Sequence, residues 1–180
     1  MVFLDESGFQ MTPVVRRTYA PRGKTPIVEA FFRKGKISAI SAVTVSPVRR
    51  RCGLSFQLLP DNTNAHGEET VAFLAQLRKR LQGPTTILWD QSKIHQRSGV
   101  VKKYLAKHPE VVTEEFPGYA PDANPDEGVW GYTKYHRLPN YAPEDTHELR
   151  SRLCSELSSL RRRPDLLVSF IRHAGIPLRL

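Results

Sequence analysis

The sequence predicts an α/β fold, with a mixed five-stranded sheet flanked by helices. Val2–Leu4 and Ile87–Trp89 are short apolar runs without alternation, which is typical of strands buried on both faces. Between them, Glu68–Leu81 carries apolar residues at helical spacing. The chain has 180 residues, of which 39% are hydrophobic and 25% charged. It therefore suits one globular domain that buries roughly 70% of its unfolded surface.

Two further strands are expected between the apolar runs. Ile37–Val45 is rich in small and β-branched residues, and Leu54–Leu59 begins with alternating residues. We expect both to be antiparallel and to extend the sheet that begins at Val2, which makes the sheet mixed. Ahead of them, Glu6 and Ser7 are expected to begin a loop, and Thr18–Ala20 to form a brief strand.

The second half of the chain alternates helices with strands. The expected elements are a helix at 68–81, a strand at 86–90, a helix at 96–107, a strand at 111–113, a helix from 124, a loop at 135–143, and helices at 144–160 and 165–173. We assign residues 1–135 to the core of the domain. Residues 136–180 are expected to form a C-terminal helical extension packed on the same domain.

Phe116–Trp130 is a proline-punctuated approach to a helix that carries acids in its first turn. Its three prolines argue against a helix before Asn124, which is a good N-cap residue. Pro125 suits the first helical position, and acids stabilise a helix start. Glu127 could close a capping box around Asn124, or its carboxylate could be functional.

Two other acids follow the apolar strands directly. Asp5 and Asp90 each end such a run. Adjacent strands lie about 4.8 Å apart, so aspartates at their carboxyl ends can share a divalent ion. With Glu127 as a third carboxylate, the mutual repulsion is tolerable only with cations between the acids. The pattern outlines a magnesium site.

These residues carry a resemblance to a known family. The segments are Leu4-Asp-Glu-Ser-Gly-Phe9, Arg17-Thr-Tyr-Ala-Pro-Arg-Gly23, Asp90 with His95, and Tyr119-Ala-Pro-Asp-Ala-Asn-Pro-Asp-Glu127 with Trp130 and Lys134. In this order the chain resembles mariner-type DDE transposases and, more narrowly, the catalytic domain of their bacterial insertion-sequence relatives. The resemblance runs from Val2 to about Lys134, and the Pro-Asp-x-Asn-Pro-x-Glu block is its specific part.

The resemblance implies a ribonuclease H-like fold, with which the element order read independently agrees. It also implies that Asp5, Asp90 and Glu127 are catalytic residues and ligands of two Mg²⁺ ions, for which Mn²⁺ could substitute. The implied reaction is DNA strand cleavage followed by attack of the freed 3′-hydroxyl on target DNA. The implied partner is double-stranded DNA, as transposon ends and target, and a homodimer is a family-level expectation.

The sequence departs from the family pattern in three ways. Gln91 follows the second acid where the family usually has asparagine, and Asp90 and Glu127 are slightly further apart than is usual. The chain also begins at the first catalytic strand, without the N-terminal helix-turn-helix module of the family. A separate DNA-binding subunit or an upstream reading frame could supply that module.

The net charge of +9 indicates a polyanionic partner, although it would also suit a ribosomal or membrane-surface protein. Basic residues crowd the first third of the chain, at Arg16, Arg17, Arg22, Lys24, Arg33, Lys34, Lys36 and Arg49–Arg51. We assign Arg17, Arg22 and Lys24, together with Lys134, to DNA binding through phosphates. The alternative is a set of solvated loop charges.

Several side chains have two interpretations. His95 is assigned to DNA binding, but it could also hydrogen-bond a metal-ligating carboxylate or fill the start of the following helix. Trp130 could stack on an unpaired base or anchor its helix in the core. Arg161–Arg163 could contact DNA or a second protomer, or be a solvated helix end. Glu6 could be an additional acid at the metal site, a residue that hydrogen-bonds the metal ligands, or a surface residue.

Two rival functions stay open: a catalytically silent transposase remnant that binds DNA or a partner, and a stand-alone ribonuclease H-like nuclease such as a junction resolvase. No apolar run is long enough to span a membrane, and no signal peptide precedes Asp5. Cys52 and Cys154 are not in metal-ligand spacing and are expected to be reduced. We expect a cytoplasmic, nucleoid-associated protein without a membrane partner.

Overall fold

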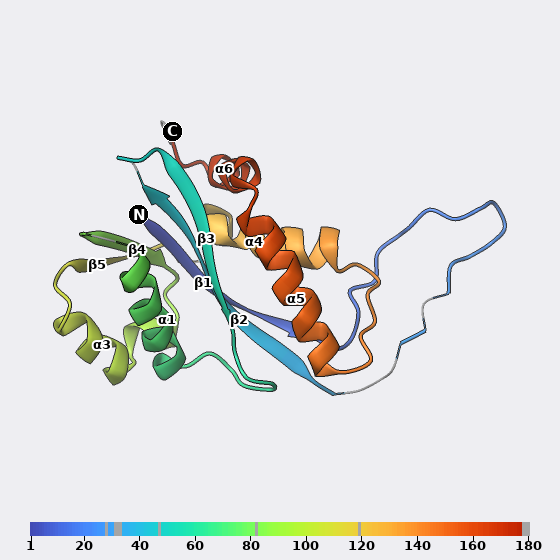
Figure 1. The fold of residues 1–180 in the computed structure, drawn as a ribbon, viewed down its shortest axis with the longest axis horizontal. Coiled ribbons are helices and arrows are strands. Elements are labelled where there is room, and N and C mark those ends of the chain that lie inside the picture. The colour runs from blue at the N-terminus through green and yellow to red at the C-terminus, as the bar shows by residue number, and fades with distance from the viewer. Residues whose placement is uncertain (28, 31–33, 47, 82, 119, 178–180) are drawn as a thin grey trace.

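The computed structural model describes residues 1–180 apart from 28, 31–33, 47, 82, 119 and 178–180. Its strands are β1 (Val2–Gln10), β2 (Lys36–Ser46), β3 (Arg51–Leu58), β4 (Thr85–Trp89) and β5 (Val111–Glu115). They form one sheet in the order β3-β2-β1-β4-β5 (Figure 1). Strand β2 is antiparallel to β1 and β3, whereas β4 is parallel to both β1 and β5. The predicted mixed five-stranded sheet is confirmed.

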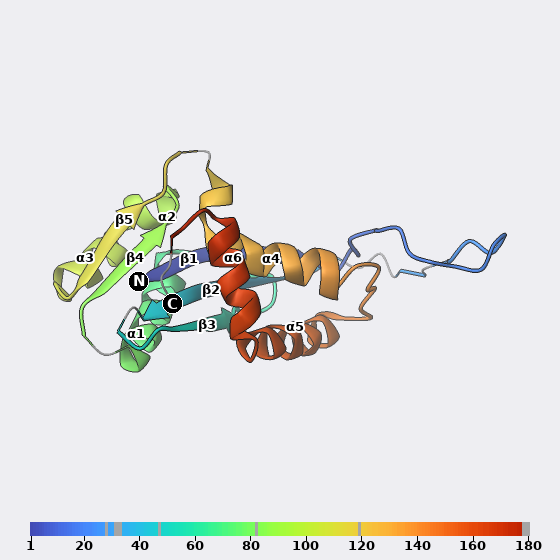
Figure 2. The same ribbon diagram turned by 90° about the horizontal axis from the view of Figure 1, so that it is seen from above.

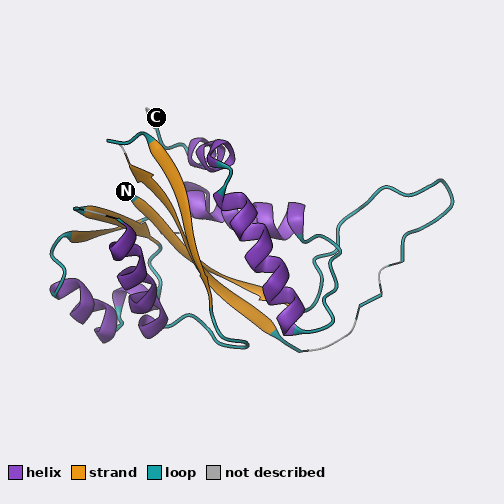
Figure 3. Cartoon of the chain, viewed as in Figure 1, coloured by secondary structure: helices purple, strands orange, loops and turns teal. Residues whose placement is uncertain are grey.

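Helices cover both faces of this sheet (Figures 1 and 3). They are α1 (Gly67–Arg80), α2 (Lys93–Gln96), α3 (Gly99–Ala106), α4 (Pro125–Tyr132), α5 (Thr146–Arg161) and α6 (Pro164–His173), with a 3₁₀-helix at Pro121–Ala123 and a π-helix at Thr133–Arg137. Helices α4, α5 and α6 pack on one face, and α1 and α3 on the other. The sheet is therefore the central layer of three.

Strand β1 contributes to the cores on both faces. Successive side chains of a strand point to opposite faces. Phe3 and Phe9 accordingly pack with α4, α5 and α6, whereas Val2 and Leu4 pack with α1. The uninterrupted apolar run that predicted this strand is thus the consequence of covering helices on both sides.

The C-terminal helices complete the first of these cores. Apolar residues of α5 and α6 share one cluster with the sheet and α4: Leu149, Leu153, Leu157, Leu160, Leu167 and Ile171. Helices α5 and α6 therefore pack directly on the sheet, as Figure 2 shows for α5 and α6 beside β3 and β2.

Two predictions at the start of the chain are wrong. Glu6 and Ser7 do not begin a loop, because β1 stays paired with β2 from Val2 opposite Thr44 to Gln10 opposite Lys36. The partner strand holds these polar residues extended. The brief strand expected at Thr18–Ala20 is absent, since that segment lies in a long connection that leaves the sheet and has no neighbouring strand.

Three helix predictions also need correction. The helix expected at 96–107 is two helices, because Ser98 caps a new one by accepting a hydrogen bond from the Val101 N–H at 3.4 Å. The prolines do not exclude all helical structure before Asn124, since a single 3₁₀ turn forms there. The loop expected from 135 begins later, because α4 continues directly into the π-helix.

The described residues between 12 and 35, which we call the arm, lie between β1 and β2 in the chain and project from the body of the protein (Figures 1 and 2). The base of the arm is attached to the segment after α4. Val14 bridges Pro139, and the Arg16 N–H donates to Asn140 Oδ1 at 2.9 Å. Arg33, one of the basic residues singled out in the sequence, lies outside the described residues.

Two further predictions concern the chain as a whole. Cys52 and Cys154 are both free thiols, as expected from their spacing. Within the described ranges, no helix combines the length and the apolar character that crossing a bilayer requires.

Candidate active site

Asp5 and Asp90 lie just beyond the point where β1 and β4 separate. The parallel ladder pairs Val2 with Ile87 and Phe3 with Leu88, and it ends there. Asp5 follows two residues later within β1, and Asp90 follows two residues later, directly after the end of β4. The fold therefore delivers two carboxylates to the same edge of the sheet.

Glu127 reaches this edge from the first turn of α4. Asn124 caps the helix by accepting the Asp126 N–H at 3.1 Å, and its own amide donates to the Leu4 carbonyl of β1 at 3.5 Å. The Asn124 N–H bonds to the Pro121 carbonyl at 2.9 Å rather than to Glu127, so Glu127 does not close a capping box. Its carboxylate stays exposed.

Trp130 fixes how α4 lies on the sheet. Its ring is buried and meets Phe9 of β1 edge to face, with the ring centroids 5.8 Å apart and the planes at 70°. The prediction that Trp130 anchors the helix in the core is confirmed. Burial also leaves no face on which a base could stack.

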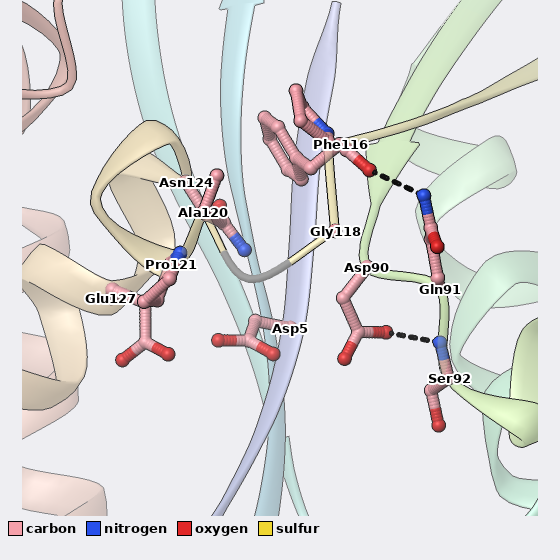
Figure 4. Close-up of a pocket in the computed structure, with 11 residues that line it drawn as sticks. Asp5, Asp90, Gln91, Ser92, Phe116, Gly118, Ala120, Pro121, Asn124 and Glu127 are labelled. Atoms are coloured by element: carbon pink, nitrogen blue, oxygen red, sulfur yellow. Dashed lines mark hydrogen bonds between the residues drawn. The ribbon is translucent and has the colours of Figure 1, made fainter.

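The three acids line one open cavity of about 460 Å³. In Figure 4, Asp5 lies between Glu127 and Asp90, and the three carboxyl groups point into the same space. The rest of the wall comes from Gln91, Ser92, Phe116, Pro117, Gly118, Ala120, Pro121 and Asn124. Tyr119, which the sequence motif includes, lies outside the described residues.

The acids act on one another electrostatically. Burial first, and then the charges of Glu127, Glu6 and Asp90, together raise the pKa of Asp5 to about 8, against the opposing effect of the hydrogen bond from the Glu6 N–H. A carboxyl group that is hard to ionise becomes an effective ligand once a cation offsets the repulsion.

Asp90 has two hydrogen-bond donors on one oxygen. Its Oδ1 accepts the Ser92 N–H at 3.0 Å and lies 3.0 Å from His95 Nδ1. The hydrogen bond with His95 holds the pKa of Asp90 below its usual range. Asp90 is therefore ionised and oriented.

His95 is a buried link rather than a surface residue. Its side chain is 1% exposed, and Nε2 lies 3.1 Å from Glu6 Oε1. Burial lowers the pKa of His95, but the hydrogen bonds with Asp90 and Glu6 outweigh it and raise the pKa to about 10. We correct the DNA-binding assignment of His95, because a ring without exposed surface cannot reach a phosphate.

Lys134 projects toward the acids from the π-helix that follows α4. Its Nζ donates to Ser7 Oγ at 2.7 Å and lies 5.3 Å from the centre of the Phe9 ring. Burial lowers the pKa of Lys134, while the charges of Glu127 and Asp5 oppose that shift. The ammonium group is thus half-buried and feels the charges of Glu127 and Asp5, although Lys134 is not among the residues that line the cavity, and its contact with DNA stays a prediction.

The structure does not bring the other predicted DNA-binding residues to the cavity. Arg17, Arg22 and Lys24 lie on the arm and are exposed, and none of them pairs with an acid among the described residues. They remain available to phosphates at a distance from the three acids.

Asp126 is a functional candidate that the sequence analysis did not identify. It is fully buried, its Oδ2 accepts from Ser41 Oγ at 2.5 Å, and its Oδ1 lacks a partner among the described residues. The spacing of residues in the sequence is consistent with this burial. Asp126, Val129, Trp130 and Thr133 recur at helical spacing and are all buried, so they share the inner face of α4 and its continuation, and Glu127 faces outward.

The residues around the cavity fit divalent cations in kind. Carboxylate oxygens are the hard ligands that Mg²⁺ and Mn²⁺ prefer, and the raised pKa of Asp5 reflects its burial first and the charges of the neighbouring acids second. As the side chains stand, no group of three or more His, Cys, Asp or Glu residues in the described part of the chain is arranged to hold an ion. If each of two ions is bound by only two of the three carboxylates, the three need not converge on a single point.

Fold and site together define a ribonuclease H-like domain with an acidic cavity at the sheet edge. The family model for DDE superfamily endonucleases matches residues 1–150. The chain therefore belongs to the DDE superfamily endonuclease family. No curated protein matched the sequence.

Solved structures of the Mos1 mariner transposase have the same fold. Its paired-end complex with Mg matches with a TM-score of 0.67 and 13% identity, over 97% of this chain and 53% of that one. The complex with Mn gives 0.66 and 15%, over 97% and 51%. The Mos1 catalytic domain gives 0.51 and 12%, over 99% and 83%. At such identities the likeness shows the fold, and the chain spans about half the length of the complexed Mos1 chains.

Proposed function

We propose that this chain is the catalytic domain of a mariner-type DDE transposase, in the bacterial insertion-sequence branch. The proposed reaction is cleavage of a DNA strand followed by transfer of the freed 3′-hydroxyl to target DNA. The observation that carries the proposal is that Asp5, Asp90 and Glu127, from three separate elements, line one cavity. A substrate phosphate would enter this cavity.

Asp5 would be the shared ligand of two divalent ions, because it lies between the other two acids. Asp90 and Glu127 would each hold one ion from the side. Bound at these carboxylates, two Mg²⁺ ions would supply Lewis-acid activation of a water or a 3′-hydroxyl and charge stabilisation of the leaving oxygen. The protein itself then needs no nucleophilic side chain.

The remaining side chains hold the acids and the DNA. His95 orients Asp90, while Trp130 and Asn124 fix the start of α4 against β1. Lys134 and the exposed cations of the arm would bind backbone phosphates, which positions DNA without reading its sequence. Mos1 was solved in complex with its left transposon end, which supports double-stranded DNA as the partner proposed here. A nucleoid location in the cytoplasm and a homodimer belong to the same proposal.

The test is metal-dependent nicking of supercoiled DNA. With Mg²⁺ or Mn²⁺ the parent chain should convert it to the open circular form, and chelation should stop the reaction. Asp5→Asn, Asp90→Asn and Glu127→Gln keep side-chain size but lose a ligand charge. Each should reduce the rate by about 100-fold or more, as when a charge-stabilising group is removed from a reacting centre.

Asp165→Asn is the matched control, because Asp165 is an exposed acid that pairs with Arg163 on α6, outside the cavity. It should nick at the parent rate. An Asp90→Asn variant as active as the parent would remove Asp90 from the site. Equal activity of all three acid variants would remove the proposed chemistry.

A catalytically silent, DNA-binding transposase remnant is the second candidate. It is favoured by the finding that no three ligand side chains in the described ranges are arranged around a single ion. DNA binding without metal-dependent nicking, unchanged in the acid variants, would establish it.

A further inference from the structure

The separation of Asp5 and Asp90 is not set by the backbone. Hydrogen bonds of the parallel ladder hold β1 and β4 together only at Val2–Ile87 and Phe3–Leu88. Both aspartates lie beyond the last pair. Something other than the ladder must hold the two carboxylates at a working distance.

A side-chain bridge crosses between the strands at this point. Glu6 follows Asp5 on β1, and its Oε1 lies 3.1 Å from His95 Nε2. The other ring nitrogen of His95 lies 3.0 Å from Asp90 Oδ1 and 3.2 Å from the Asp90 carbonyl. Glu6, His95 and Asp90 therefore link β1 to the end of β4 through side chains, beyond the last backbone pair of the ladder.

The middle of the bridge is held firmly. His95 is buried and stacks on Trp89, with the ring centroids 4.3 Å apart and the planes within 6°. Ser92 caps the short helix that carries His95, and its N–H also donates to Asp90 Oδ1. Because Oδ1 already has two donors, Oδ2 is the Asp90 oxygen that remains for another ligand.

We propose that His95 and Glu6 are positioning residues that set the separation of Asp5 and Asp90 and present Asp90 Oδ2 to a divalent cation. This inference rests on the proposed metal-dependent function. It assigns to Glu6 and His95 a role in cation affinity without direct contact with the cation. Groups behind metal ligands commonly act in this way.

The experiment measures Mn²⁺ binding to the full chain by electron paramagnetic resonance of the free ion, alongside nicking. His95→Ala should bind Mn²⁺ about 10- to 100-fold more weakly than the parent, the usual cost of losing a partner behind a ligand. His108→Ala is the matched control. His108 also pairs with a carboxylate, Glu110, at 3.3 Å and lies 4.5 Å from the Tyr104 ring, but outside the cavity. Its Mn²⁺ affinity should equal that of the parent.

His95→Ala also removes a buried ring, so a second pair of variants approaches the bridge from its more accessible end. The Glu6 side chain is 14% exposed. Glu6→Ala breaks the bridge, whereas Glu6→Gln keeps an oxygen that can accept from His95. At matched thermal stability, Glu6→Gln should bind Mn²⁺ more tightly than Glu6→Ala. A general loss of structure would not separate these two variants.

The outcomes distinguish the two proposals. If Asp90→Asn binds Mn²⁺ as tightly as the parent, Asp90 is not a ligand and this inference falls, whereas the proposed function fails only if Asp5→Asn and Glu127→Gln also bind as tightly as the parent. If Asp90→Asn weakens binding but Glu6→Ala and His95→Ala do not, only the positioning role is overturned. Equal losses in Glu6→Ala and Glu6→Gln would also overturn it, because charge alone would then explain the effect.

Discussion

Ser41 Oγ donates a hydrogen bond to Asp126 Oδ2 at 2.5 Å in the interior of the protein. Ser41 is the β2 residue opposite Asp5, so this bond ties α4 to the sheet directly beside the cavity. Burial, with the charge of Asp5 next, raises the pKa of Asp126 well above its usual range. The carboxyl group of Asp126 is therefore much harder to ionise than that of a free aspartate.

The first prediction concerns this pair. Ser41→Ala leaves the buried carboxyl group of Asp126 without its partner and should lower the free energy of unfolding by about 1–3 kcal/mol. Asp126→Asn resembles the neutral acid in size and can still accept from Ser41, so it should cost less. Urea denaturation at neutral pH measures both. An Asp126→Asn variant less stable than Ser41→Ala would show that a charged Asp126 is needed.

The second prediction concerns pH in the absence of metal. The pKa of Asp5 rises from 3.8 to about 8 on folding. Between these values the folded state binds more protons than the unfolded state, so stability falls as pH rises. Above about pH 8 both states are ionised and the effect levels off. Thermal denaturation in EDTA from pH 5 to 8 should show this decline in the parent.

Asp5→Asn is the control for that decline. It cannot ionise, so the variant should lose this part of the pH dependence and be more stable than the parent in EDTA at pH 8. Saturating Mg²⁺ should reverse the order by stabilising only the parent, by about 2.7 kcal/mol at 100 times the dissociation constant. A decline of equal slope in both proteins would assign the pH effect to another group.

The third prediction compares two glycines of α4. A Cβ at Gly128 would meet the Phe170 ring of α6 at 2.6 Å, whereas one at Gly131 would meet nothing within 4 Å. Gly128→Ala should therefore cost about 1–3 kcal/mol through overpacking. Gly131→Ala should stabilise the protein by up to about 1 kcal/mol, because alanine is the better helix former. Equal denaturation midpoints for the two variants would contradict this close contact.

The fourth prediction concerns the arm. Replacing Arg17, Arg22 and Lys24 with glutamine should weaken binding to DNA of any sequence. Each lost phosphate contact should reduce the slope of log affinity against log salt by about 0.9. Fluorescence anisotropy at several salt concentrations measures this slope. The same change at Lys102, Lys103 and Lys107, near and within α3, is the charge-matched control, and an equal effect would mean that net charge alone governs binding.

The sequence pattern predicted the sheet because strands that are buried on both faces are continuous apolar runs. Val2–Leu4 and Ile87–Trp89 are apolar on both faces, and that pattern predicts strands. The polar half of β1, from Glu6 to Gln10, has no such pattern. It is a strand because β2 runs beside it, and a partner that is distant in sequence is invisible to local propensity.

The acids of the cavity were predictable, but their support was not. Asp5 and Asp90 each end an apolar run, and Glu127 follows a proline and a cap, so each has a local signal. The bond between Glu6 and His95 joins residues far apart in the sequence, and no spacing rule indicates it. His95 was therefore assigned to DNA, whereas its ring is enclosed between two acids and Trp89.

Gln10 and Lys36 face each other across the β1–β2 ladder, so the chain leaves and re-enters the sheet at adjacent points. The hairpin would close around a short turn just as well as around the arm. Doubling the length of a flexible loop costs only about 0.6 kcal/mol of closure entropy. Changes of length in the described part of this segment beyond Arg16, outside the contacts of Val14 and Arg16 with the body, are thus expected to cost the domain little stability.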